Sequence, residues 1–304
     1  MKKLILFFLF CTTLSTAQNY VDLLRIGYGE SFNNSFEGTN SETSITSFDA
    51  SITIPLPLTE KYTFITGADF SLNNLQLFPE ASFTSLYSTT LKVGLATTHS
   101  DVWSSTLVLL PKIASDYSGV SSEDFFLGGF AVFKFKKKEN LIYRFGAYGS
   151  TEAFGFFATP IIGWYYLSPN ERFEMDVSMP ISADVNYALG GVTVGVDYFG
   201  IGRSFNIDSN LPKTYVQQGA LEFSGYVQGN VLQKSVLLRA KIGYASSDFE
   251  VYEDGDTYDL GLSAFRFGDD RTRLNPELSG GAFLKFEAIY RFNIKKKESI
   301  LDSQ

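Results

Sequence analysis

Apolar and polar residues alternate along most of this chain, and the pattern is clearest between Gly219 and Tyr244. Every second residue from Leu221 to Val231 is apolar or glycine, and most of the residues between them are polar. After a break at Leu232–Lys234 the alternation resumes and continues to Tyr244. A period of two predicts β-strands, because successive side chains in a strand point to opposite faces.

The two strands of this hairpin have the length and the faces of a membrane wall. Each is about 11 residues long, which is enough to cross a bilayer when the strand is tilted. One face is apolar, whereas the other carries Glu222, Gln228, Arg239 and Lys241, which a dry sandwich core would not accept. Apolar outward and polar inward residues are typical of a transmembrane β-barrel.

The rest of the chain repeats this pattern between segments rich in Asn, Ser, Gly and Pro. Predicted strands lie at 22–28, 47–54, 62–72, 90–95, 102–114, 124–135, 141–150, 156–167, 173–179, 192–198 and 283–292. Asp184–Leu189, after Pro180, is either a short return strand or an inward-folded segment. Counting the uncertain region around Pro180 as two short strands gives a barrel of fourteen strands, and counting that region as one insertion gives twelve. Both counts are even, which places both termini in the periplasm.

The connections between these strands alternate between short and long. In bacterial barrels the short turns are periplasmic and the longer loops extracellular. Segments 206–217 and 246–277 are predicted loops, and the second is the longest. The predicted fold is therefore all-β: a single antiparallel up-and-down transmembrane barrel of 12–14 strands.

The N-terminus has the features of a secretory signal peptide. Two lysines follow Met1, an apolar run extends from Leu4 to Leu14, and a small-residue site ends at Ala17. We therefore expect a signal peptide at 1–17, an outer-membrane barrel at 18–294 and a polar periplasmic tail at 295–304. The only cysteine, Cys11, lies in the signal peptide, which excludes disulfides and thiolate metal sites from the mature chain.

Charge and composition exclude several other classes. Cleavage removes two of 25 basic residues and none of the 33 acidic ones, so the mature net charge is 23 − 33 = −10. An acidic chain is a poor nucleic-acid binder. Beyond the signal no apolar run reaches the roughly 18 residues of a spanning helix. A content of 16% aromatic residues with 26 glycines favours many aromatic-rich strands.

The alternation also predicts which charged side chains face the barrel interior. Six are basic and seven acidic: Asp49, Asp69, Lys92, Arg144, Glu174, Asp176, Asp197, Glu222, Arg239, Lys241, Lys285, Glu287 and Arg291. Such a balanced lumen has two interpretations. Paired charges fill a narrow interior, because unpaired buried charge is costly, or they line a conduit or pocket for a small solute. The residue types are the same in both cases.

Two further groups of residues suggest contact with the outer membrane. Aromatic residues near strand ends fit interfacial girdles: Tyr62, Tyr87, Trp103, Trp164, Tyr165, Tyr166, Tyr198, Tyr290 and Phe292. Three arginines, Arg266, Arg271 and Arg273, are predicted to pair with Asp269 and Asp270 or to contact lipopolysaccharide phosphate. The expected partners are thus outer-membrane lipid and lipopolysaccharide.

No motif in the sequence predicts catalysis. The acidic run Glu253–Asp259 has calcium-type ligands but lacks the spacing and the closing glutamate of a calcium loop. The only histidine, His99, has Ser100 and Asp101 beside it, but a catalytic triad converges from separate elements. We expect no enzyme activity, no metal and no cofactor.

Three further segments resemble an uncharacterised family of outer-membrane barrels. They are Met179–Tyr187, Phe265–Arg271 and Ile289–Asn293, and the Ser15–Gln18 junction resembles export signals of Bacteroidota. The resemblance implies a barrel in the outer membrane of such a bacterium, with no activity assigned. The sequence therefore predicts a non-catalytic outer-membrane barrel with a channel, transport or surface-binding role. The alternative is a soluble secreted β-sandwich or adhesin-type binding protein.

Overall fold

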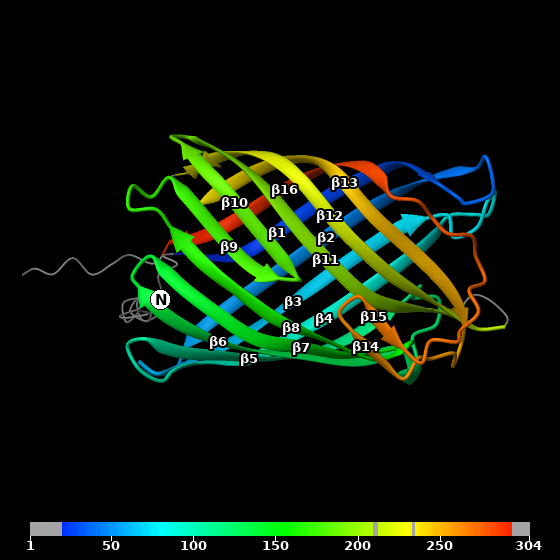
Figure 1. Ribbon diagram of the computed structural model, residues 1–304, viewed down its shortest axis with the longest axis horizontal. Helices are drawn as coiled ribbons and strands as arrows, with labels where there is room; N and C mark the ends of the chain where they lie inside the picture. The colour runs from blue at the N-terminus through cyan, green and yellow to red at the C-terminus, as the bar shows by residue number, and fades with distance from the viewer. Residues whose placement is uncertain (1–19, 209–211, 233–234, 294–304) are drawn as a thin grey trace, which may run out of the picture.

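A single closed β-barrel accounts for almost all of the chain (Figure 1). The computed structural model describes residues 20–208, 212–232 and 235–293, so the predicted signal peptide and tail lie outside the described residues. Its sheet has sixteen strands, of which β14 and β15 form a side hairpin and the other fourteen form the barrel. Among the described residues, no helix has the length and the apolar character needed to cross a membrane.

The strands run in chain order around the wall. Their bounds are β1 Tyr20–Ser35, β2 Glu42–Pro57, β3 Tyr62–Leu75, β4 Thr84–Thr98, β5 Trp103–Ser115, β6 Phe125–Lys138, β7 Leu141–Glu152, β8 Gly155–Leu167, β9 Phe173–Met179, β10 Ser182–Leu189, β11 Val192–Ile207, β12 Thr214–Val231, β13 Val236–Glu253, β14 Leu260–Leu262, β15 Phe265–Phe267 and β16 Gly281–Asn293. One 3₁₀ turn, η2, spans Ser122–Asp124.

Antiparallel ladders join each barrel strand to its neighbours, and β1 closes the ring against β16. The region around Pro180 forms two strands, because β10 pairs with β9 on one side and β11 on the other. The fourteen-strand prediction is therefore confirmed, and the twelve-strand alternative with an inward-folded segment is wrong. The β-sandwich alternative is wrong as well, because one closed sheet replaces two packed sheets.

The two faces of the wall differ as the alternation predicts. In β13, Leu237 faces inward with 1% of its surface exposed, whereas Leu238 faces outward with 53% exposed. The exposed outward residues form an apolar belt that includes Leu91, Leu107, Phe133, Ile162, Val196, Phe223, Val227, Ile242, Leu284 and Phe286. Such a belt is the surface that a transmembrane barrel presents to lipid. Tyr165 is an exception to the predicted girdle, because it faces inward and is fully buried.

The loop end of the barrel differs from the prediction at three places. Two connections on that side of the strands, 153–154 at the loop end and 180–181 partway along the wall, are two-residue turns rather than long loops. The predicted loop 246–277 contains the end of β13 and the β14–β15 hairpin. The ends of β12 and β13 are buried on both faces, so their sequences lose the alternation that marks a half-buried strand.

Candidate binding cavity

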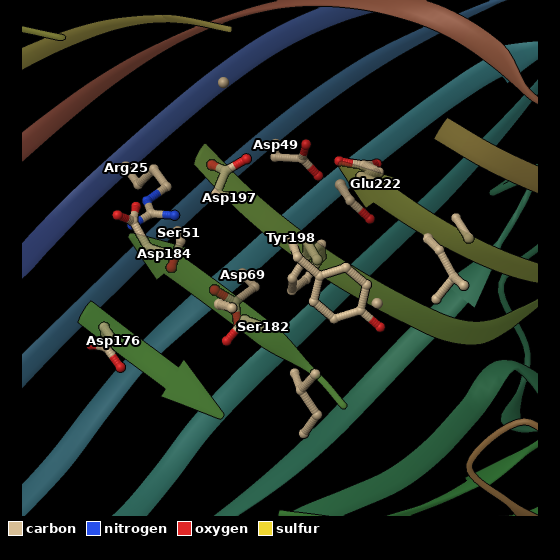
Figure 2. Close-up of a pocket in the computed structure, with 18 of the residues that line it drawn as sticks. Arg25, Asp49, Ser51, Asp69, Asp176, Ser182, Asp184, Asp197, Tyr198 and Glu222 are labelled. Carbon is tan, nitrogen blue, oxygen red and sulfur yellow. The ribbon is translucent and has the colours of Figure 1, made fainter. Parts of the chain in front are cut away.

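A cavity of about 1360 Å³ occupies the barrel interior. Inward side chains from most of the barrel strands line it, and Figure 2 shows carboxylates converging on it from β2, β3, β9, β10, β11 and β12. This volume exceeds that of an ordinary small-molecule pocket. Three features shape it: a closed loop end, a narrowed turn end and a charged wall.

An apolar cluster closes the loop end. It gathers buried residues from strands around the ring: Phe36, Ile45, Leu75, Leu77, Leu86, Ala114, Phe126, Phe205, Ile207, Val216, Phe249, Val251 and Leu278. The end of β11 bends inward to reach it, because Asn206 pairs with Ser115 of β5, which is not a neighbour of β11 in the wall. A second cluster of Phe154, Tyr215, Tyr252 and Tyr258 adjoins it.

Arg271 holds the loop after β13 over this closed end. Its guanidinium lies 4.0 Å from the ring centre of Tyr252 and 4.7 Å from that of Tyr258. It donates to both carboxylate oxygens of Asp269 and to the Tyr215 hydroxyl. These hydrogen bonds lower the pKa of the Asp269 carboxyl below its ordinary value, against a smaller opposing effect of burial.

The other two loop arginines are also paired within the chain. Arg266 donates to both oxygens of Glu250, and Arg273 donates to both oxygens of Asp248. Arg266 is also 3.7 Å from Asp269. The predicted pairing with Asp269 is thus confirmed for Arg271 and Arg266, whereas Arg273 pairs with β13.

The turn end is narrowed by a contact across the lumen. The Tyr20 hydroxyl of β1 donates to Glu174 of β9, although these strands lie six places apart around the ring. Arg291 stacks 3.4 Å from the centre of the Tyr20 ring and donates to both oxygens of Asp22. Tyr165 also lines this part of the cavity.

A row of carboxylates crosses β9, β10 and β11 on the inward face. Asp184 is directly opposite Asp176 on one side and Asp197 on the other. Like charges directly opposite each other in a sheet repel, so cations must offset this row. Arg144 binds Asp176 at 2.6 Å. On the other side, Arg239 is 3.2 Å from Asp184 and Lys241 is 2.7 Å from Asp197.

The opposite wall repeats this pairing. Lys92 is 2.6 Å from Asp69, and Lys285 is 2.8 Å from Asp49. All the predicted interior residues line the cavity except Lys92, which is on the same inward face and also donates to hydroxyls of β2. Their predicted role in handling a solute stays a prediction.

The two partners of these ion pairs are not equally accessible. The side chain of Asp49 is 43% exposed and that of its partner Lys285 only 13%. Asp69 is 42% exposed against 15% for Lys92, and Asp176 is likewise more exposed than Arg144. Glu287 departs from this order, since it is as buried as its partners. Two other pairs that line the cavity have the opposite order, since Arg25 is 48% exposed against 21% for Asp22, and Arg266 is 32% exposed against 11% for Glu250. At the Asp49, Asp69 and Asp176 pairs, a solute therefore meets mainly carboxylate oxygens.

The alternation missed a buried polar network beside the closed end. Lys112 of β5 donates to both oxygens of Glu152 at 2.6 and 2.8 Å, and Glu152 also accepts from Ser204. Arg203 donates to Gln218 and Ser71 nearby. Arg203 is six residues after Asp197 and thus on the same face, so a longer predicted β11 would have included it.

Two observations concern metal binding and catalysis. Within the described ranges, no group of three or more His, Cys, Asp or Glu side chains is arranged to hold a metal ion. His99 lies in an exposed turn, where its Nε2 is 2.7 Å from the Ser105 hydroxyl.

A family model described as "Domain of unknown function (DUF6268)" matches residues 14–192, more than half of the chain. The chain belongs to the DUF6268 family. The resemblance to a family without assigned activity is thereby confirmed, whereas an origin in Bacteroidota stays a prediction. No curated protein matches the chain.

Several solved structures match this chain along most of its length, at low sequence identity. TodX, described as a monoaromatic hydrocarbon channel (deltaS2 mutant), is 10% identical, with a TM-score of 0.36 over 90% of this chain and 89% of that one. The β-domain of the Bordetella autotransporter BrkA is 10% identical, with a TM-score of 0.32 over 90% and 100%. Pseudomonas aeruginosa OpdQ is 11% identical, with a TM-score of 0.29 over 90% and 97%.

Proposed function

We propose that this DUF6268 protein is an integral outer-membrane barrel that binds small cationic solutes in its interior cavity without catalysis. The proposal includes export by a signal peptide that is cleaved after Ala17. The apolar outward belt supports placement in a membrane. The exposed carboxylates of the cavity are the reason for proposing a cationic solute, because the cations paired with them lie deeper in the wall.

Calorimetric titration of the purified barrel tests this choice of solute. The probes are 1,4-diaminobutane as a small dication and succinate as a matched dianion. We expect binding of the dication only, weakening with added salt because partly exposed charges are screened. Equal binding of both probes, or stronger binding of succinate, would overturn the proposal.

Substitution of two accessible carboxylates, Asp49 and Asp69, locates the binding. In the Asp49→Asn/Asp69→Asn double variant we expect affinity for 1,4-diaminobutane to fall about two- to fivefold per carboxylate removed, as for partly exposed ion pairs. Glu139→Gln is the matched control, because Glu139 is in an exposed turn with a 70% exposed side chain. A loss of affinity in the control as large as in the double variant would place the cation outside the cavity.

The closed loop end favours a second candidate, a filled barrel with a structural role at the cell surface. In that case the interior ion pairs serve packing alone. The unmodified protein would then bind neither 1,4-diaminobutane nor succinate.

A further inference from the structure

The barrel wall has a break beside the shortest strands. β9 and β10 have 7 and 8 residues, whereas the adjoining β8 and β11 have 13 and 16. The β8–β9 ladder covers only Ile162–Leu167, and the β10–β11 ladder covers only Val192–Phe199. Toward the loop end, β8 and β11 therefore continue without a barrel strand between them, as Figure 1 shows beyond the turn that joins β9 to β10.

The lower margin of this break is the turn Pro180–Ile181. The Gly200 amide donates to the Ile181 carbonyl at 2.8 Å, and this bond ends the contact of β11 with the β9–β10 hairpin. The upper margin is at Ser204, whose hydroxyl binds the Ala153 amide and Glu152. Four residue steps separate Gly200 from Ser204, which is roughly 13 Å at the usual rise of a strand.

The β14–β15 hairpin covers only part of the break. β14 pairs with β8 at two residues, Phe157 and Ala158, and a hydroxyl contact joins Ser263 to Thr159. Opposite them, Gly202 of β11 has no side chain, and the atom nearest to an added Cβ would be in the Phe157 ring at 3.6 Å. An opening thus remains between the two hairpin turns.

The interior cavity extends to this opening. Its lining includes Pro180 and Ile181 of one turn, Ser263 and Ala264 of the other, and Gly202 between them. The apolar cluster meanwhile blocks the axial path at the loop end. We infer that the cavity opens sideways toward the bilayer, between the Pro180–Ile181 and Ser263–Ala264 turns, and that this opening admits amphiphiles with a cationic head and a hydrocarbon chain.

The residues at the opening match the two parts of such a molecule. Phe199 has an inward position in β11 but is 45% exposed, and Leu221 is exposed beside Gly200. Both offer apolar surface to a chain that extends from the lipid. Glu222 is directly opposite Phe199 in the ladder and lines the cavity, and Asp197 lines it two residues further along β11 toward the turn end. An ammonium head would meet these carboxylates, whereas an anionic head would be repelled.

A variant that fills the opening tests the route. The choice of a cationic head rests on the proposed function, whereas the opening itself does not. In Gly202→Trp the indole would occupy the space in front of Phe157. Gly191→Trp is the matched control, because Gly191 is in the β10–β11 turn with no atom within 4 Å of an added Cβ. The probe is dodecylamine in phosphatidylcholine vesicles that contain the protein, with protein-free vesicles as background.

We expect dodecylamine binding to slow about tenfold in Gly202→Trp, as for an obstructed entry path, and to be unchanged in Gly191→Trp. Binding of 1,4-diaminobutane, which enters from the aqueous turn end, should change little in either variant. Equal rates of dodecylamine binding in all three proteins would overturn the sideways route. Failure of the unmodified protein to bind 1,4-diaminobutane would overturn the proposed function instead.

A second measurement judges the opening without any ligand. The mature chain is predicted to have no cysteine, so a single fluorophore can be attached to Phe199→Cys at the opening or to Ser51→Cys on the far wall. Both native residues are inward-facing, and Ser51 lines the cavity. A nitroxide on the lipid acyl chains should quench the label at 199 and not the label at 51. Equal quenching at the two positions would show that lipid does not reach the opening.

Discussion

Ile242→Arg gives the most direct test of the membrane-facing wall. Ile242 is on the outward face of β13 and is 66% exposed. It is six residues from Val236, where β13 leaves its turn. A rise of about 3.4 Å per residue and a tilt of about 45° give roughly 14 Å along the membrane normal, near the middle of a band about 25 Å tall. Leu238, by the same measure, is close to the edge of the band at the turn end.

The expected cost follows from this depth. An arginine on the lipid face of a barrel costs about 2–4 kcal/mol at the midplane and 0–1 kcal/mol near the interface. A loss of 2–4 kcal/mol lowers the folding equilibrium constant by roughly 30- to 700-fold, at 1.4 kcal/mol per factor of ten. In water the same substitution would cost little, because Ile242 is already exposed.

The assay is reversible folding into phosphatidylcholine vesicles, followed by tryptophan fluorescence across a guanidinium series. Leu232→Arg is the matched control, because Leu232 is 74% exposed but lies in the turn after β12, outside the belt. We expect the Ile242 variant to be less stable by the amount given and the Leu232 variant to match wild type. Equal stability of all three proteins would show that the outward face of β13 does not contact hydrocarbon.

Two further predictions concern the closed loop end. Phe249→Ala removes a fully buried ring from the apolar cluster, so we expect a loss of about 3–5 kcal/mol and new ion leakage in planar bilayers, whereas Phe286→Ala on the lipid face should not leak. Because the pKa of Asp269 is lowered by Arg271, its contribution to holding the loop is complete above the unfolded value of about 3.9 and is lost as pH falls through the lower folded value. Amide exchange in residues 254–280 should therefore rise in that acidic range, and Asp269→Asn should remove the pH dependence.

The alternation of apolar and polar residues was sufficient to predict the barrel wall. The face to which a side chain points depends only on its position along its own strand. A period of two assigns Glu222 inward and Phe223 outward without any knowledge of the partner strand. It also places Asp184 in a strand once that segment is allowed to pair. The number of strands and the charged interior face follow from this rule.

The features that shape the cavity depend on contacts between distant segments, which the alternation does not encode. Strand ends such as Thr214–Gln218 are buried on both faces by the inward bend and the overlying loop. The contact of Tyr20 with Glu174 joins opposite walls. The greater exposure of Asp49 than of Lys285 depends on how far each side chain extends into the lumen. None of these changes the pattern of residues along a single strand.

The ladder between β1 and β16 has a consequence for biogenesis. The first strand hydrogen-bonds only to the second and the last, and its register with the last runs from Tyr20↔Asn293 to Phe32↔Ala282. Until the C-terminal strand is delivered, the growing sheet has two free edges that can pair with other chains. Both edges must therefore be protected until the last strand has been made and has paired with the first. A chain that stops before Gly281 would keep its hydrogen-bonding edges open and be prone to aggregation.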